Sequence, residues 1–246
     1  MQQRQKRTAL VLSGGGARGS YQVGALKAIA HILPDGGMNP FDIICGTSAG
    51  ALNASMLACE SDHYGHAVKR LETLWQNLQS DQIHKVGYTQ LLKSTLRLFF
   101  SFFHDGIASG AASALLDNEP LRKLLSTEIN FDKLDEHINN GRLHALCITA
   151  LAYNSGHNIS FFQGDSNIKG WRRNQRLGVG TRLTHDHLMA SSALPTIFPP
   201  VKIDHEYFGD GAIRQRAPLS AALHLGAEKL FVVGVSYHEK EREEPI

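Results

Sequence analysis

Cysteines and long apolar runs are scarce in this chain of 246 residues. The three cysteines, Cys45, Cys59 and Cys147, stand apart in apolar stretches, and none has a partner at the Cys-x-x-Cys spacing. An odd number of thiols in apolar surroundings argues against a disulfide framework and for a reducing compartment, and the missing spacing argues against structural zinc. No run reaches the about 18 apolar residues of a transmembrane helix, and the first apolar run is too short for a signal peptide. We therefore expect a cytoplasmic protein without a membrane span.

The chain also lacks a dominant charge, with 25 Lys and Arg against 23 Asp and Glu. Its densest basic group, Arg172, Arg173 and Arg176, has no interleaved aromatic track, so we expect it to decorate a loop and expect no nucleic-acid partner. Hydrophobic residues make up 42% of the chain, which is typical of a folded protein. This length and composition predict one α/β domain.

Two strand-to-helix units open the chain. Apolar runs over 8–13 and 41–46 predict strands, and helical spacing over 18–33 and 48–58 follows each of them. A glycine-bearing turn joins each pair, which is the rhythm of a parallel sheet. The remaining expected elements are helices over 62–125 and 130–141, a buried strand over 142–154 with a hairpin partner over 158–163, a capped helix over 184–195, strand pieces over 201–212, a helix over 218–227 and a buried strand over 229–236.

The first turn carries the sequence LVLSGGGARGS, in which Gly14, Gly16 and Gly19 fit G-x-G-x-x-G. Glycine-rich loops before a helix bind anions, because backbone N–H groups and the helix dipole both favour negative charge. A dinucleotide site would also need an acidic residue at the end of the second strand, but Asp42 lies at its start. A Walker A site would need Gly-Lys-Ser/Thr where the chain has Arg18-Gly19-Ser20.

The second turn reads GTSAG over 46–50, which is the G-x-S-x-G pattern of a nucleophile elbow between a strand and a helix. In a parallel sheet both turns lie at the carboxyl ends of their strands, so Ser48 and the first loop become neighbours. We therefore interpret Gly14, Gly15 and Gly16 as an oxyanion hole, with Arg18 adding charge or bracing the loop.

A serine nucleophile needs a base. Asp210, in the sequence DGA, is one candidate, although Asp-Gly alone is more often an ordinary turn. His238 would suit the Ser-Asp-His order of an α/β-hydrolase. That fold places its elbow after several strands, whereas here the elbow follows the second one.

The motifs GGGARG, GTSAG and DGA, in this order, resemble the three signatures of the patatin-like phospholipases, and ASSALPTIFPPV at 190–201 and PLSAAL at 218–223 add to the likeness. The resemblance covers about residues 8–236. It implies a three-layer α/β/α sandwich with a central, mostly parallel sheet, as a single patatin-like domain over 1–246 that a longer protein could continue. It also implies a Ser48–Asp210 dyad without a catalytic histidine, an oxyanion region at Gly14, Gly15, Gly16 and Arg18, no metal or cofactor, and hydrolysis of phospholipid or other acyl-ester lipids.

Acyl transfer to an alcohol would use the same residues, and a non-catalytic lipid- or nucleotide-binding domain would keep only the glycine loop.

Two further segments lie outside these motifs. His185-Asp186-His187 lacks a third metal ligand at known spacing and is interpreted as a capped helix start. Residues 91–103 (LLKSTLRLFFSFF) are apolar nearly all round a helix. They predict either a core helix or a peripheral membrane contact.

Overall fold

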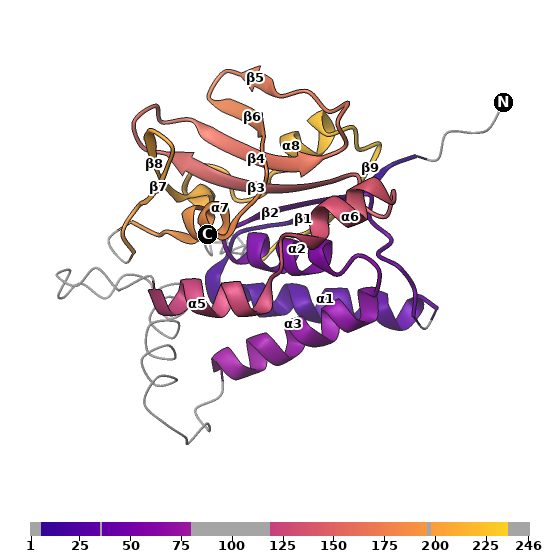
Figure 1. Cartoon of the computed structure of the whole chain (residues 1–246). Helices are drawn as coiled ribbons and strands as arrows, with labels where there is room; N and C mark the ends of the chain where they lie inside the picture. Colours follow the sequence, from indigo (N-terminus) through magenta and orange to yellow (C-terminus); the bar gives the residue numbers. More distant parts are fainter. Residues whose placement is uncertain (1–5, 35, 80–118, 196–197, 236–246) are drawn as a thin grey trace, which may run out of the picture.

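The computed structural model describes residues 6–34, 36–79, 119–195 and 198–235 (Figure 1). Segment 91–103, most of the helical region expected over 62–125, and His238 lie outside the described residues. No helix in the described ranges is long and apolar enough to cross a membrane.

In the described part of the chain, a mixed sheet of nine strands forms the centre, in the order β5-β6-β4-β3-β2-β1-β9, with the hairpin β7-β8 paired onto β3. Strands β9, β1, β2 and β3 run parallel, whereas β4 and β8 run antiparallel to β3. The strands are β1 (Thr8–Leu12), β2 (Ile43–Thr47), β3 (Ala145–Ala152), β4 (Asn158–Gly164), β5 (Trp171–Arg173), β6 (Arg176–Gly180), β7 (Val201–Ile203), β8 (Glu206–Asp210) and β9 (Lys229–Val233).

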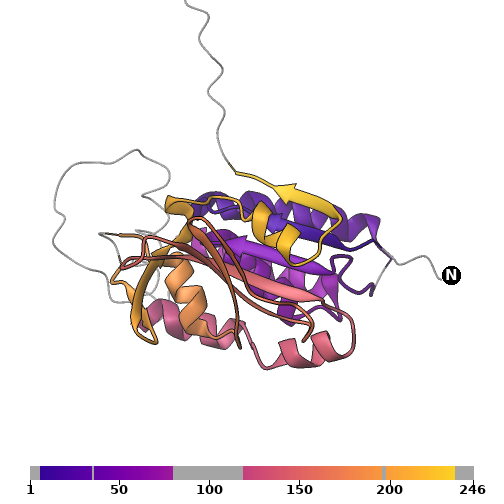
Figure 2. The same ribbon diagram turned by 90° about the horizontal axis from the view of Figure 1, so that it is seen from above.

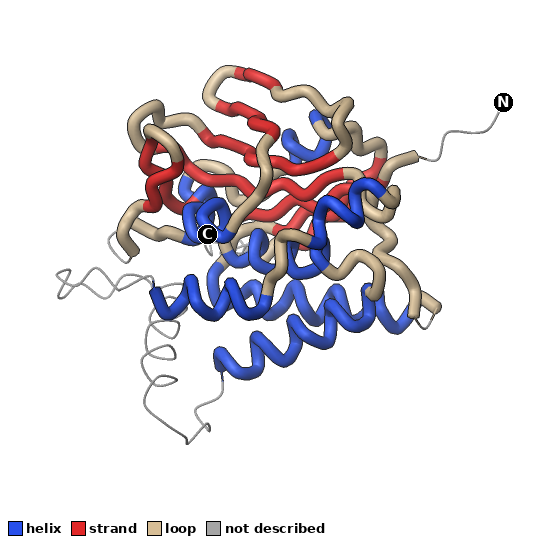
Figure 3. Tube along the Cα trace, viewed as in Figure 1, coloured by secondary structure: helices blue, strands red, loops and turns tan. Residues whose placement is uncertain are grey.

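Helices cover both faces of this sheet (Figure 3). One face packs against the larger core, to which α1, α2, α3, α5, α6 and α7 contribute, and the other packs against α8. The predicted three-layer α/β/α sandwich is therefore confirmed. The helices are α1 (Gly19–Ile32), α2 (Ala49–Cys59), α3 (Tyr64–Gln79), α5 (Glu119–Glu128), α6 (Lys133–Asn139), α7 (His185–Ser192) and α8 (Leu219–His224), with short 3₁₀ turns η1 (Gly16–Arg18) and η2 (Gly211–Ile213).

Two sequence predictions about the sheet edges are wrong. Arg172, Arg173 and Arg176 lie on strands β5 and β6 rather than in a loop, joined by a turn at Asn174 with φ of 41°. Their exposed side chains fit an edge hairpin, where charge protects against aggregation. The strand over 229–236 was expected to be buried, but four of the five residues of β9 are exposed. Strand β9 is the outermost strand of the sheet (Figure 2), and its residues are therefore less covered than those of a central strand. An apolar run alone cannot distinguish an edge strand from a central one.

Candidate active site

Ser48 stands in a sharp turn between β2 and α2. Its backbone has φ of 54° and ψ of −126°, a region that is costly for a residue with a side chain. A Cβ on Gly46 would lie 2.3 Å from the Gly50 carbonyl oxygen, and one on Gly50 would lie 2.4 Å from the Leu12 carbonyl oxygen. Both glycines of G-x-S-x-G are thus required by close packing, and the turn that they permit raises Ser48 at the start of α2.

Asp210 ends β8 and meets this serine across 162 positions of sequence. The Ser48 hydroxyl donates a hydrogen bond of 2.7 Å to Asp210 Oδ2. The other carboxylate oxygen accepts from the Ala212 amide at 2.7 Å, and the Asp210 amide donates to the Ala193 carbonyl at 2.8 Å. Backbone contacts on both sides therefore fix the carboxylate that faces Ser48.

The pair is completely buried, at 0% exposure for Ser48 and for Asp210. Burial raises the pKa of Asp210 to about 6, against the opposing effect of the hydrogen bonds from Ser48 and from the Ala212 amide. Both opposing groups are neutral donors. A carboxylate with a pKa in this range can accept a proton in one step and release it in the next.

The glycine loop lies beside this pair. A Cβ on Gly14 would come within 2.6 Å of Ala212 Cβ and 3.4 Å of Ser48 Cβ. The Gly14 amide donates to the Arg216 carbonyl at 2.8 Å, so it already has an acceptor. Within the described ranges the amides of Gly15 and Gly16 have none. Of the three glycines predicted to form an oxyanion hole, Gly15 and Gly16 therefore keep amides available for a substrate.

Gly16 and Arg18 close the loop at η1. Gly16 has φ of 53°, which favours glycine, and the Arg18 amide donates to the Gly15 carbonyl at 3.1 Å. The Arg18 Nε atom is buried and has no hydrogen-bond partner in the part of the chain that the structure describes. Whether Arg18 adds charge to the loop or braces it therefore stays a prediction.

A chain of hydrogen bonds between buried side chains supports the glycine loop, and it was not predicted from the sequence. Gln22 donates to the Ser13 carbonyl at 2.7 Å, Asn53 donates to Gln22 at 2.9 Å, and the Trp75 indole donates to Asn53 at 2.8 Å. These side chains come from α1, α2 and α3. The one signal in the sequence is an amide side chain, Gln22 or Asn53, on the buried face of each of two helices.

Ser191 on α7 is a second residue that sequence reasoning missed. Its hydroxyl accepts a hydrogen bond of 2.9 Å from the Ser48 amide and donates one of 2.7 Å to the Thr149 carbonyl. Ser191 thereby ties the strained turn to β3. It falls within the stretch ASSALP that carried part of the family resemblance, but nothing in that pattern distinguished its hydroxyl from that of Ser192.

Other candidates from the sequence lie away from Ser48. Asp42 accepts from the Thr8 amide at 2.7 Å, at the start of β2 and the far end from the glycine loop. The capped start of the helix over 184–195 is confirmed, because Thr184 and His187 form a capping box at α7. His185 contacts the Ile129 carbonyl at 2.9 Å, and Asp186 pairs with Arg122 at 2.6 Å.

Comparison with known proteins gives one family and several relatives. The family model described as patatin-like phospholipase matches residues 10–223. Proteins named cGAMP-activated phospholipase, from Pseudomonas aeruginosa and Vibrio cholerae, are each 29% identical over 87% of this chain, and the matches cover 55% and 56% of those proteins. A lysophospholipase nte1 from Aspergillus terreus is 43% identical over 32% of this chain and 5% of its own length. The chain spans about half the length of the two bacterial relatives.

Proposed function

The chain belongs to the patatin-like phospholipase family, and we propose that it is a serine lipid acyl hydrolase that cleaves carboxylic esters of phospholipids or lysophospholipids. The observation that carries the proposal is the 2.7 Å hydrogen bond between Ser48 Oγ and Asp210 Oδ2 in a fully buried site. A serine hydroxyl is a weak nucleophile until an adjacent base takes its proton.

In the first half of the reaction, Asp210 accepts the Ser48 proton while Oγ attacks the ester carbonyl carbon. The negative charge that develops on the carbonyl oxygen is stabilised by the amides of Gly15 and Gly16. When the tetrahedral intermediate collapses, the ester C–O bond breaks and Asp210 returns the proton to the leaving alcohol. An acyl group then remains on Ser48.

In the second half, Asp210 takes a proton from water, and the resulting hydroxide attacks the acyl carbon. Collapse of this intermediate returns the proton to Ser48 Oγ and releases the fatty acid. The burial that raises the pKa of Asp210 serves both halves, because a more basic carboxylate accepts a proton more readily than a solvated one.

The first test is labelling with a fluorophosphonate, which forms a covalent bond with an activated serine. We expect the label on the peptide that contains Ser48, and no label in Ser48→Ala. Ser55→Ala is the matched control, since Ser55 lies on α2, the helix that follows Ser48, is equally buried, and its hydroxyl has no partner within the described residues. Unlabelled wild-type protein would contradict the proposal.

The second test measures fatty-acid release from phosphatidylcholine, lysophosphatidylcholine and triacylglycerol. Release from one of the first two supports a phospholipase or lysophospholipase. If acyl groups appear as esters of an added alcohol instead of free acid, acyl transfer is the activity of the same residues. Absence of turnover on all three, with Ser48 unlabelled, would favour a non-catalytic lipid- or nucleotide-binding domain.

A further inference from the structure

Two arginines lie in the same row of the sheet as the residue that precedes Asp210. The strand pairing forms this row across β8, β3, β4, β6 and β5, from Gly209 through Leu151, Asn158 and Arg176 to Arg173. Directly paired residues point to the same face of a sheet, so Arg173 and Arg176 share one face. Three strand spacings, about 14 Å in total, separate Arg176 from β8. The arginine pair therefore lies at the same end of the sheet as the candidate active site.

Arg214 connects this pair to the candidate active site. It follows η2, the short turn that begins directly after the candidate base. Its guanidinium donates to the Gly156 carbonyl at 2.7 Å and to Gln175 Oε1 at 3.3 Å. Gly156 belongs to the β3–β4 turn, and Gln175 immediately precedes Arg176. Arg173, Arg176 and Arg214 are all exposed, and none forms an ion pair with a described residue.

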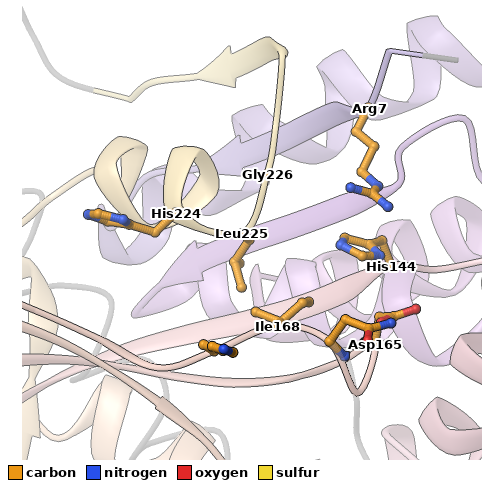
Figure 4. Close-up of a pocket in the computed structure, with 9 residues that line it drawn as sticks. Arg7, His144, Asp165, Ile168, His224, Leu225 and Gly226 are labelled. Carbon is orange, nitrogen blue, oxygen red and sulfur yellow. Dashed lines mark hydrogen bonds between the residues drawn. The ribbon is translucent and has the colours of Figure 1, made fainter. Parts of the chain in front are cut away.

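Two histidines show how the surroundings of Arg173 differ from those of Arg7. His144 and Arg7 precede β3 and β1 and lie close together, whereas His224 ends α8 (Figure 4). Burial and the Arg7 charge lower the pKa of His144, but Asp165 and a second carboxylate oppose them. Burial and the Arg173 charge lower the pKa of His224, and no described carboxylate opposes them. The Arg7 charge is therefore offset by nearby carboxylates, and the effect of Arg173 on His224 is not.

Aromatic and apolar side chains continue the exposed surface beside these arginines. Tyr153, Tyr207 and Ile213 are 38%, 45% and 49% exposed. The Tyr153 ring lies against Gly209, because a Cβ on this glycine would collide with the Tyr153 hydroxyl. The Tyr153 amide donates to the Tyr207 carbonyl at 2.9 Å, and Ile213 precedes Arg214 in the chain. These three residues and the three arginines make up what we call the basic–aromatic surface.

Protection of the sheet edge explains only part of this surface. Charge on an edge strand prevents strand pairing whatever its sign, but Arg214 lies outside the edge hairpin. The β7–β8 hairpin contributes Asp204 and Glu206, and the Glu206 carboxylate accepts a hydrogen bond of 2.9 Å from an amide of the β3–β4 turn. The same hairpin also contributes Lys202, which pairs with Tyr207. Three arginines and one lysine thus stand against two carboxylates, and the surface is basic.

We propose that the basic–aromatic surface docks the protein onto an anionic phospholipid bilayer, with its arginines at the lipid phosphates and its tyrosines beside the headgroups. The proposal rests on the proposed function, because a hydrolase of phospholipids meets its substrate at a bilayer. A guanidinium fork matches phosphate oxygens, and tyrosine favours the membrane interface. Each basic residue near an anionic membrane strengthens binding about fivefold. A bilayer fits better than a nucleic acid, because the surface adjoins the candidate lipid site.

The test is sedimentation of the full chain with vesicles made from dialkyl ether analogues of phosphatidylcholine and phosphatidylglycerol, which an ester hydrolase cannot cleave. We expect binding that weakens at least tenfold in Arg173→Gln/Arg176→Gln. The matched control, Lys6→Gln/Lys69→Gln, removes the same charge from exposed residues outside the surface and should bind as the wild type does. Added salt should weaken binding of the wild type, because ions screen exposed charges. An unchanged Tm shows that the arginine variant is folded. If it does not fold, a loss of about fivefold in Arg173→Gln alone supports the proposal.

Three results would overturn the proposal. One is equal binding by the arginine variant and the control, and another is equally tight binding to vesicles of the phosphatidylcholine analogue alone. The third is binding of a single-stranded DNA oligonucleotide without binding to either vesicle, which would assign the surface to a nucleic acid. Fluorophosphonate labelling separates these failures from failure of the proposed function. Labelled Ser48 with any of the three results rejects only the docking surface, whereas unlabelled Ser48 with arginine-dependent vesicle binding rejects only the hydrolase.

Discussion

Asp210 and Glu60 are both buried carboxylates, but their surroundings are opposite. Asp210 faces two neutral donors, and burial raises its pKa to about 6. Glu60, 7% exposed at the end of α2, contacts His66 at 2.9 Å and Lys133 at 3.2 Å and pairs with Arg70. Burial alone would raise the pKa of Glu60 too, but these hydrogen bonds and charges outweigh it and leave the pKa below its usual value.

The difference separates the proposed base, Asp210, from a carboxylate that joins helices, Glu60. Glu60 is held ionised by partners on α3 and α6, and Arg70 also reaches Glu128 on α5 at 3.1 Å, so four helices meet at this cluster. A carboxylate with such partners cannot take a proton from a serine at neutral pH. No cation of the described residues acts on the Asp210 carboxylate, which fits the proposed exchange of a proton with Ser48.

The largest expected effect is on catalysis. Ser48→Ala and Asp210→Asn should each lower the rate of ester hydrolysis by about 10⁴-fold or more, because the two residues act as one unit. The double variant should be about as inactive as either single one. Initial rates on a short soluble ester measure this. Near-normal turnover in Asp210→Asn would reject Asp210 as the base and return attention to a histidine such as His238.

Parts of the fold and of the candidate site could be predicted from the sequence. The turn at Ser48 was predictable because its close packing leaves no room for a Cβ at Gly46 or Gly50. Both glycines are part of the G-x-S-x-G motif, so the requirement is visible in the sequence. The strand and helix rhythm predicted a parallel α/β sheet, and the family resemblance implied its three layers. Asp210 was one candidate base beside His238, and only the family resemblance favoured it, since its approach to Ser48 depends on the pairing of β8 with β3.

Other features depend on tertiary contacts that leave no local pattern. Ser191 and Ser192 are adjacent and alike in sequence, but only Ser191 meets the Ser48 amide. The exposure of β9 follows from its place at the sheet edge, and its apolar run could not reveal that. The cluster around Glu60 joins residues from separate helices, and no local pattern in the sequence marks it.

The second effect is on stability. Glu60→Gln should lower the free energy of unfolding by about 2–4 kcal/mol, because it removes the buried charge that Arg70 and Lys133 share and leaves Arg70 with Glu128 alone. Activity per folded molecule should stay unchanged. Urea unfolding followed by fluorescence measures the loss. The matched control is Glu72→Gln, whose partner Lys27 has a side chain 45% exposed, and it should cost less than about 1 kcal/mol. Equal losses in both variants would show that burial of Glu60 does not matter.

A smaller effect on rate is expected at Ser191. Ser191→Ala removes the acceptor of the Ser48 amide, so the strained turn should lose its alignment with Asp210, and we expect kcat to fall about 10–100-fold. KM should change little, because Ser191 contacts the turn and not the substrate. Ser192→Ala is the control, because it removes the same hydroxyl from the neighbouring buried serine, and its kcat should equal that of the wild type. If both serine variants show the same kcat, Ser191 does not position the nucleophile.

The smallest effect is on the stability of Asp210→Asn, which should rise, whereas that of Glu60→Gln should fall. The pKa of Asp210 is raised by folding, from 3.8 to about 6, so the folded protein binds this proton more tightly than the unfolded chain does. The stabilising contribution is therefore complete below pH of about 4 and is lost as pH rises through about 6. Asp210→Asn, which cannot carry the buried charge, should be about 1–2 kcal/mol more stable than the wild type at pH 8, less than the shift alone implies because the amide changes the hydrogen bonds. This advantage should shrink as pH falls from 7 to 4.

Urea unfolding at pH 8 and pH 5 tests this prediction, with Glu60→Gln as the comparison. Glu60 has a lowered pKa, so its stabilising contribution is instead lost in acid. An Asp210→Asn variant that is less stable than the wild type at pH 8 would mean that its hydrogen bonds to Ser48 and Ala212 outweigh the cost of burying the charge.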